Sequence, residues 1–192
     1  INGPSGSGKS HLLSILGVLN TPTSGRVVID DIDVYSLDQE KRADFRSDYI
    51  GFVFQAFQLV PYLTALENVM LPLCITRWGN RDQEELAGDA LSSVGLSGKG
   101  ERLPNQLSGG EVQRVAIARA VVNKPEILFA DELTGNLDTE NSREIMKLLA
   151  ELASSGKTVI MVTHETDIAA WADYTLHLRD GRLVDRKEKA VV

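Results

Sequence analysis

Residues 3–10 read GPSGSGKS and match the phosphate-binding pattern G-x-x-x-x-G-K-[ST] completely. The glycines of such a loop let backbone N–H groups curl around phosphate oxygens. Lys9 adds a cation for the β- and γ-phosphates, and Ser10 offers its hydroxyl to Mg²⁺. An apolar stripe at helical spacing follows the loop, as this motif requires: Leu12, Leu16 and Leu19. The stretch therefore predicts a nucleotide site that opens a helix.

Composition limits the classes of function. The 192 residues suffice for one domain, or for one domain with a small insertion, and 43% of them are apolar. Acidic residues outnumber basic ones by 27 to 20, which argues against nucleic acid as a partner. The single cysteine, Cys74, excludes an internal disulfide and indicates a reducing compartment. No apolar run approaches the roughly 20 residues that cross a bilayer, so we expect no direct membrane insertion.

Three short apolar runs predict strands buried on both faces of a mostly parallel sheet: YIGFVF (49–54), EILFA (126–130) and TVIMVT (158–163). Helical patterns lie between them, one with a stripe formed by Ile145, Leu149 and Leu152 before Gly156. The fold class is therefore α/β. The chain begins only two residues before the phosphate-binding loop, whereas such loops normally follow a full strand, so we expect upstream sequence to be missing.

Other segments are predicted to lie outside the parallel sheet. RVVID (26–30) is typical of an antiparallel strand, and YTLHL and RLVD flank Asp180-Gly181, a favoured hairpin turn. Between residues 64 and 106 there is no convincing strand, but QEELAGDALSSVG (83–95) is helical. This stretch is the candidate for a helical insertion.

A polar group follows each buried strand, and parallel strands bind ligands at their carboxyl ends. We therefore expect the loop at 3–10, Gln55, the pair Asp131 and Glu132, and His164 to converge on one place. Asp131 is predicted to hold Mg²⁺, and Glu132 to orient or deprotonate an attacking water. Two adjacent acids at a strand end could instead be merely solvated. Gln55 could bridge the metal and the water, and His164 could bond the γ-phosphate, although a lone glutamine is usually surface and a lone histidine usually structural.

LSGGE (107–111) has the form of a capping box, in which Ser108 and Glu111 satisfy free N–H groups at a helix start. Each glycine in a helical turn costs about 0.5–1 kcal/mol relative to alanine, so the pair Gly109 and Gly110 needs a reason. One reading is that helix starts tolerate glycine and that one glycine suits a tight approach between packed elements. The other is that an anion touches bare backbone at the positive end of the helix dipole.

The whole chain resembles the nucleotide-binding subunits of ATP-binding cassette (ABC) transporters. Six motifs stand in the family's order: the P-loop at 3–10, the glutamine loop at Gln55, LSGGE (107–111), the acidic strand ILFADE (127–132), the D-loop GNLD (135–138), and the switch histidine His164. Its IGFVFQAFQLVPYLTALENVMLPL and TGNLD segments are most similar to the bacterial lipoprotein-releasing and macrolide-efflux branch, to which a cell-division ATPase also belongs.

The resemblance implies a P-loop NTPase core at about 1–63 and 107–192, and a helical subdomain at about 64–106. It implies ATP and Mg²⁺ as cofactors, with Mg²⁺ held at Ser10, Gln55 and Asp131 and catalysis by Glu132, His164 and Gln55. The implied nucleotide contacts are Gly3, Pro4, Ser5, Gly6, Ser7, Gly8, Lys9, Ser10 and His11 from one chain, with Ser108, Gly109, Gly110, Glu111 and Asp138 acting across a head-to-tail dimer.

The implied partners are a second copy or a paired ABC subunit, and an integral membrane permease at the cytoplasmic face of the cell membrane. The helical subdomain and the segment after Gln55 would form the permease groove, and Leu59, Tyr62 and Leu63 could line it or pack in the core. Departures from the family pattern include His11 for threonine and Leu133 for proline. The alternatives are a regulatory coupler, as in cell division, and a soluble ABC ATPase of repair or translation. The latter is disfavoured because the sequence has no coiled-coil insertion, tandem cassette or basic arm.

Overall fold

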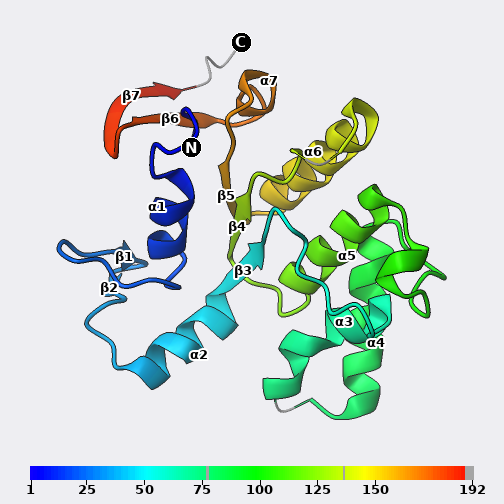
Figure 1. The fold of residues 1–192 in the computed structure, drawn as a ribbon. Helices are drawn as coiled ribbons and strands as arrows, with labels where there is room; N and C mark the ends of the chain where they lie inside the picture. The colour runs from blue at the N-terminus through cyan, green and yellow to red at the C-terminus, as the bar shows by residue number, and fades with distance from the viewer. Residues whose placement is uncertain (77, 136, 189–192) are drawn as a thin grey trace.

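The computed structural model describes residues 1–76, 78–135 and 137–188. At its centre lies a parallel sheet of β3 (Ile50–Val53), β4 (Ile127–Asp131) and β5 (Thr158–Val162) (Figure 1). Phe52 pairs with Phe129, and Phe129 pairs with Ile160, so the three strands run in register. The three strands predicted from the apolar runs are confirmed. Because they are in register, they also end together at one edge of the sheet.

The first residues of the chain extend this sheet beyond β5. The amino group of Ile1 donates to the carbonyl of Met161 at 2.6 Å, and the N–H of Thr163 donates to the carbonyl of Ile1 at 3.0 Å. On the other side Asn2 bridges to β6 (Tyr174–Arg179), which pairs with the antiparallel β7 (Arg182–Glu188). The predicted hairpin at Asp180-Gly181 is confirmed, and both turn residues have positive φ, 49° and 72°.

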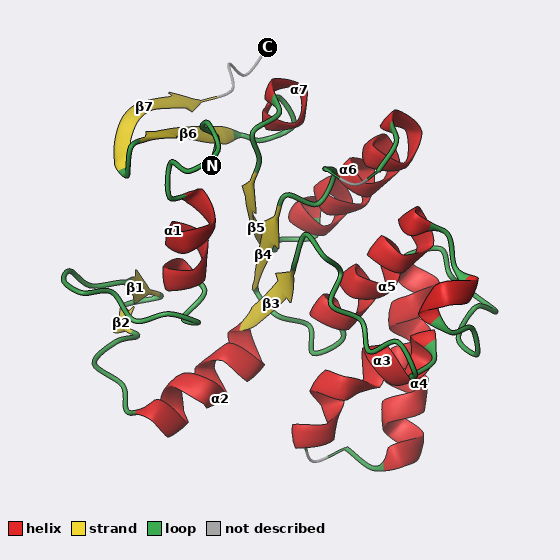
Figure 2. Ribbon diagram, in the orientation of Figure 1, coloured by secondary structure: helices red, strands yellow, loops and turns green. Residues whose placement is uncertain are grey.

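Helices cover both faces of the sheet (Figure 2). Phe129 packs on one face with Leu13 of α1 (Lys9–Leu16) and Phe45 of α2 (Gln39–Tyr49). Its neighbours in β4, Leu128 and Ala130, pack on the other face with α5 (Gly109–Val121) and α6 (Thr139–Ser154). Successive strand residues point to opposite faces, which is why this strand has no polar side. A short α7 (Thr166–Ala169) follows β5.

The predicted stripe of α1 is partly correct. Leu13, which the stripe omitted, is the buried apolar residue of the helix at 1% exposure; Leu16 is half-buried and packs against the same cluster, while Leu12 is only partly covered. Leu19 lies beyond the end of the helix and is 45% exposed. The helix ends early because Gly17 and Val18 leave the helical path, Val18 with a φ of 60°. The second predicted stripe is confirmed, since Ile145 and Leu149 of α6 are buried at 1% and 3%.

Every element described between residues 64 and 106 is helical: α3 (Ala65–Met70), the 3₁₀ segment η1 (Leu71–Ile75), α4 (Asn80–Ser93) and η2 (Pro104–Gln106). Thr64 and Glu67 form a capping box that starts α3. The predicted helix at 83–95 is therefore confirmed, whereas the division into a core and a subdomain stays a prediction. Two short strands, β1 (Val28–Ile29) and β2 (Ile32–Asp33), form a separate antiparallel pair.

Close packing of α5 on β3 requires a glycine. A Cβ at Gly51 would overlap the backbone carbonyl oxygen of Ala120, which cannot move without shifting the helix. Gly51→Ala is expected to destabilise the protein by about 1–3 kcal/mol, the usual cost of overpacking. Gly88 lies inside α4 with no atom within 4 Å of a Cβ, so Gly88→Ala should instead stabilise by about 0.5–1 kcal/mol. Urea unfolding of both variants measures the difference, and equal effects would contradict this account of the α5–β3 contact.

Candidate functional site: the carboxyl edge of the sheet

The phosphate-binding loop begins where the Ile1–Asn2 segment leaves the sheet. Gly6 and Gly8 have φ values of 79° and 91°, a conformation that side chains with a Cβ rarely adopt. The N–H of Gly181, in the β6–β7 turn, donates to the carbonyl of Ser7 at 3.1 Å and braces the loop from outside. Lys9 is 5% exposed and its ammonium donates to the carbonyl of Pro4 at 3.0 Å, so its charge is held against the concave side of the loop.

Two unused polar groups in this loop fit an anion. The hydroxyl of Ser7 is buried and has no hydrogen-bond partner, which is costly unless a ligand supplies one. An ammonium group has three donors, of which the bond to Pro4 uses one. The residues present therefore suit the phosphates of a nucleotide, with free N–H groups at the start of α1 adding to the attraction.

Ser10 and Asp131 meet at the end of β4. The Ser10 hydroxyl donates to Oδ1 of Asp131 at 2.9 Å, across 121 positions of sequence. Burial raises the pKa of Asp131 above its ordinary value, and the neighbouring charge of Glu132 acts in the same direction. The bond from Ser10 and the charge of Lys9 oppose that rise. The half-buried carboxylate is thus short of compensating positive charge, as expected of a group that receives a cation.

Glu132 and His164 face each other from the ends of neighbouring strands. Nδ1 of His164 lies 3.2 Å from Oε1 of Glu132. Glu132 has a φ of 46°, and its N–H still donates to the carbonyl of Val162 at 3.0 Å, so the chain turns sharply as it leaves the sheet. Non-glycine residues at positive φ are uncommon and cluster at functional sites. The turn directs the carboxylate toward His164, although only their proximity was expected.

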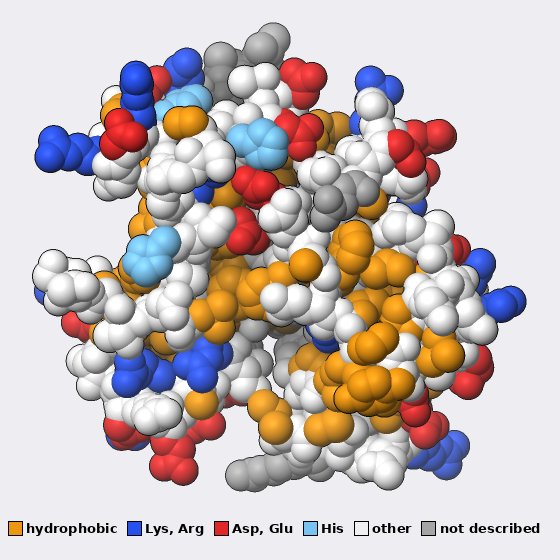
Figure 3. Space-filling model, viewed as in Figure 1, with side chains coloured by type: hydrophobic (Ala, Val, Ile, Leu, Met, Phe, Trp, Pro, Cys, Tyr) orange, Lys and Arg blue, Asp and Glu red, His pale blue; other side chains and the backbone are white. Residues whose placement is uncertain are grey.

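Gln55 lies just beyond β3, as predicted, separated from the end of the strand by Phe54. Its side-chain nitrogen Nε2 would lie 3.6 Å from a Cβ at Gly135, a residue whose N–H donates to the carbonyl of Glu132. The amide therefore lies beside the segment that leaves the acidic pair. On the face shown in Figure 3, acidic side chains gather next to a histidine in the upper half. The residues predicted at this edge are thus near one another, while their individual roles remain predictions.

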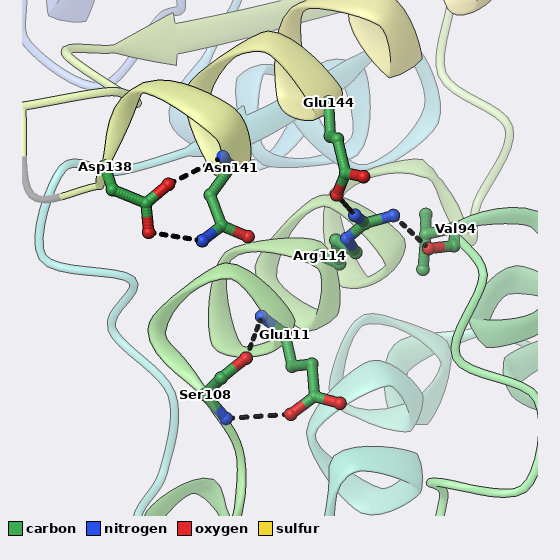
Figure 4. Close-up of polar contacts among 7 residues, drawn as sticks. All are labelled: Val94, Ser108, Glu111, Arg114, Asp138, Asn141 and Glu144. Atoms are coloured by element: carbon green, nitrogen blue, oxygen red, sulfur yellow. Dashed lines mark hydrogen bonds and ion pairs between the residues drawn. The ribbon is translucent and has the colours of Figure 1, made fainter.

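His11, the other position expected to contact nucleotide, is exposed on the first turn of α1. The remaining predicted contacts lie elsewhere. LSGGE starts α5, and its capping box is confirmed: the Ser108 hydroxyl accepts from the N–H of Glu111 at 3.3 Å, and Glu111 accepts from the N–H of Ser108 at 2.8 Å (Figure 4). The bond from Ser108 and the ammonium of Lys99, 3.1 Å away, lower the pKa of Glu111.

The two glycines of this motif differ in whether packing explains them. A Cβ at Gly110 would overlap Oδ1 of Asn141, so this glycine is explained by close packing of α5 on α6. A Cβ at Gly109 would meet nothing nearer than the Leu137 side chain at 3.8 Å, and the residue is exposed. Internal packing therefore accounts for one glycine and leaves the bare backbone of the other unexplained.

Asp138 positions the side chain of Asn141, which leaves no room for a Cβ at Gly110. Its Oδ1 accepts from the N–H of Asn141 at 2.9 Å, and its Oδ2 accepts from Nδ2 of Asn141 at 2.7 Å (Figure 4). These bonds cap α6 and lower the pKa of Asp138. Asn136 of the predicted D-loop lies outside the described residues. Sequence analysis missed Asn141, since an asparagine near a helix start gives no signal of a contact with a distant glycine.

The predicted residues therefore form two sets. The loop at 3–10, Gln55, Asp131, Glu132 and His164 gather at the carboxyl edge of the sheet. The motif at 107–111 begins α5, which packs on the opposite face of the sheet from α1 (Figure 1). Its contacts in the described structure run to Lys99, Asn141 and Leu137.

A family model described as "ABC transporter" matches residues 1–135, most of the chain. The chain belongs to the ABC transporter family. It is 50% identical over 182 residues, 94% of its length, to the lipoprotein-releasing system ATP-binding protein LolD of Syntrophotalea carbinolica, of which it spans 80%. It is 48% identical over 98% of its length to the macrolide export ATP-binding/permease protein MacB of Chlorobaculum tepidum, of which it spans only 29%.

Solved ABC cassettes have the same fold. The dimeric cassette MJ0796, in a post-hydrolysis state bound to ADP and Pi, superposes with a TM-score of 0.87 at 43% identity, over 97% of this chain and 82% of that one. The chain is thus an ATP-binding cassette with a P-loop NTPase fold, and it is an ATPase. Within the described residues, no helix is both long enough and apolar enough to span a bilayer.

Burial of Asp131 leads to a pH-dependent prediction. Because its folded-state pKa lies above the ordinary value of 3.8, the charged form destabilises the nucleotide-free fold, and this loss grows as the pH rises through the folded pKa. Asp131→Asn should therefore raise the melting temperature at neutral pH, with a gain that shrinks as the pH falls. Thermal unfolding followed from neutral pH down toward the ordinary pKa of 3.8 measures it. The exposed Asp89 in α4 provides the control, Asp89→Asn, and a gain that increased toward low pH would contradict the prediction.

Proposed function

We propose that this ATPase closes head to tail on Mg²⁺ and ATP with a second copy or a paired ABC subunit, and that closure and hydrolysis drive an integral membrane permease. The observation that carries the proposal is the division of the predicted residues into two sets, together with the exposed glycine backbone at Gly109. A helix N-terminus of this kind suits a phosphate, and a second chain can bring one to it.

In this proposal the loop at 3–10 holds the phosphates. The unpartnered hydroxyl of Ser7 and the remaining donors of Lys9 bind their oxygens, and His11 lies next along the helix. Ser10, Gln55 and Asp131 supply the oxygen ligands that Mg²⁺ prefers. The bound ion neutralises charge that develops on the phosphates. Asp131 is prepared for this role because burial leaves its carboxylate short of positive charge.

Glu132 is assigned to the attacking water and His164 to its orientation. When Nδ1 of His164 carries the proton, it donates to Oε1 of Glu132 and leaves the second carboxylate oxygen to accept a proton from water. The left-handed turn at Glu132 keeps that oxygen at the edge of the sheet rather than along the strand. Across the dimer, the partner's nucleotide would meet Ser108, Gly109, Gly110 and Glu111. Asp138 would support this segment indirectly, because it holds the Asn141 side chain that packs against Gly110.

The permease is proposed to dock on the helical side of the chain. Hydrophobic side chains gather there in Figure 3, over the part formed by α3, η1 and α4. Tyr62, Ile75 and Trp78 are 79%, 76% and 56% exposed, which is unusual for a set of large apolar side chains. Ile75 also lines a groove of about 350 Å³ between β3 and η1, which has Gln58 in its wall. Of the predicted lining residues, Leu59 instead packs against the core.

The MacB relative, whose name joins an ATP-binding part to a permease, supports this kind of partner. Docking of this kind would place the chain on the cytoplasmic face of a cell membrane as a peripheral subunit. The transported substrate is not specified by any residue of the site, because the chemistry of the site concerns the nucleotide.

The role of Glu132 is tested by Glu132→Gln. Loss of a general base should slow hydrolysis by about 10²–10⁴-fold, while ATP stays bound and holds the dimer closed. Rapid-quench single-turnover assays measure the rate, and size-exclusion chromatography with ATP measures the dimer. Glu126→Gln, at an exposed position before β4, is the matched control. Single-turnover hydrolysis near the parental rate would rule out the assignment.

Head-to-tail sharing is tested by mixing two inactive variants. Gly109→Asp places a carboxylate where the fold has room, and an acid at a helix start does not harm the helix, so the chain should fold but repel a phosphate. Lys9→Ala removes the cation of the loop instead. If sites are shared, a mixed dimer has one intact site, made from the loop of the Gly109→Asp chain and the motif of the Lys9→Ala chain.

The mixture should then recover about a quarter of the parental ATPase activity, because about half of the dimers in an equal mixture are mixed and each of these has one of its two sites restored. Activity of the mixture no greater than that of the separate variants would mean that the motif serves its own chain. Gly110→Ala provides a contrast, because its overlap with Asn141 should lower the stability of the chain itself.

A further inference from the structure

The segment that follows Gln55 has a strained backbone. Phe57 and Gln58 have φ values of 58° and 50°, so two successive residues with side chains adopt the left-handed conformation. Such residues persist only where the surrounding structure fixes them. Since Gln55 stands two positions before Phe57, whatever fixes this turn also constrains the backbone that carries the Gln55 amide.

The side chain of Arg119 makes the contacts that fix it. Nη2 donates to the carbonyl of Phe57 at 2.8 Å, and Nη1 donates to the carbonyl of Gln58 at 2.6 Å. One planar guanidinium thus binds both strained residues, and a fork of this geometry matches two adjacent acceptors as no other side chain does. These bonds span 61 and 62 positions of sequence.

The environment of Arg119 argues against an ordinary surface role. Burial alone lowers its pKa, and no ion pair of the described residues includes it. A basic residue in the last turn of a helix often serves only the helix dipole. This guanidinium instead loses part of its hydration when it binds two carbonyls of another segment. The desolvation of a charged group costs free energy, which the two hydrogen bonds must offset.

We propose that Arg119 is a positioning residue for Gln55: it holds the turn at Phe57 and Gln58, and through it sets the Gln55 amide toward the metal and the attacking water. Arg119 and the LSGGE motif belong to the same helix, α5. A rigid helix therefore ties the segment that meets a partner's nucleotide to the loop that serves the chain's own. The inference rests on the proposed role of Gln55.

The test compares Mg²⁺-dependent ATP hydrolysis by the purified chain and a set of variants. Arg119→Met keeps the length of the side chain and removes both bonds, whereas Arg119→Lys keeps the charge and can reach one carbonyl. Gln55→Ala removes the group that is positioned, and the double variant combines the changes. Arg114→Met is the matched control, because Arg114 lies on the same helix but bonds Glu144 and the carbonyl of Val94 (Figure 4).

We expect Arg119→Met to lower turnover and to raise the Mg²⁺ concentration needed for half-maximal activity by about 10–100-fold, the usual effect of losing an outer partner of a metal ligand. Affinity for ATP without metal should stay within about twofold, because the phosphate-binding loop is untouched. Arg119→Lys should lie between Arg119→Met and the parent. The double variant should have the same turnover and the same Mg²⁺ requirement as Gln55→Ala, since Arg119 has no amide left to position once Gln55 is replaced.

The outcomes separate this inference from the function on which it rests. If Gln55→Ala impairs Mg²⁺-dependent hydrolysis but Arg119→Met does not, the positioning role is wrong and the role of Gln55 stands. Multiplying effects in the double variant, or an equal effect of Arg114→Met, would also overturn it, because either indicates a general loss of stability. If Gln55→Ala leaves hydrolysis unchanged, the proposed role of Gln55 and this inference both fall. Should Arg119→Met not fold, Arg119→Lys alone gives the same comparison.

Discussion

The parallel register of β3, β4 and β5 is the constraint on which the site depends. Val53 pairs with Ala130, and Ala130 pairs with Met161, so the residue that follows each strand emerges at the same edge. Backbone bonds of the ladder, rather than contacts among the polar side chains, bring these groups together. Ile1 and Asn2 extend the ladder on the far side of β5 and deliver the phosphate-binding loop to the same edge. The chemistry is therefore assembled by the same interactions that build the core.

This arrangement makes the site costly for the fold. The hydroxyl of Ser7 and the carboxylate of Asp131 are buried without full compensation, and the turn at Glu132 requires a positive φ. Each of these features opposes folding, and the core of large apolar side chains must outweigh them. The same features suit an anion and a cation, so ligand binding should relieve much of the cost. A site optimised for the stability of the free protein would lack them.

Sequence alone predicted the strands and the edge they form, because buried strands and phosphate-binding loops have local signals. It did not predict which face of α1 is buried: Leu12 and Leu13 are equally apolar, and only packing on Phe129 selects Leu13. It also missed α2, whose exposed charged residues give little apolar periodicity around the one buried side chain, Phe45. Boundaries and faces are set by tertiary contacts, which a local pattern does not contain.

The contacts made by α5 show a second limit of prediction. Gly109 and Gly110 are the same residue type, yet Asn141 explains one of them and no contact among the described residues explains the other. At the far end of the same helix, Arg119 gives no sequence signal beyond a basic residue near a helix end. Both facts depend on segments far away in the chain. The LSGGE motif starts α5, and near the other end of this helix Arg119 binds the turn after Gln55 through the carbonyls of Phe57 and Gln58. The helix therefore links the two sets of residues that the sheet keeps apart.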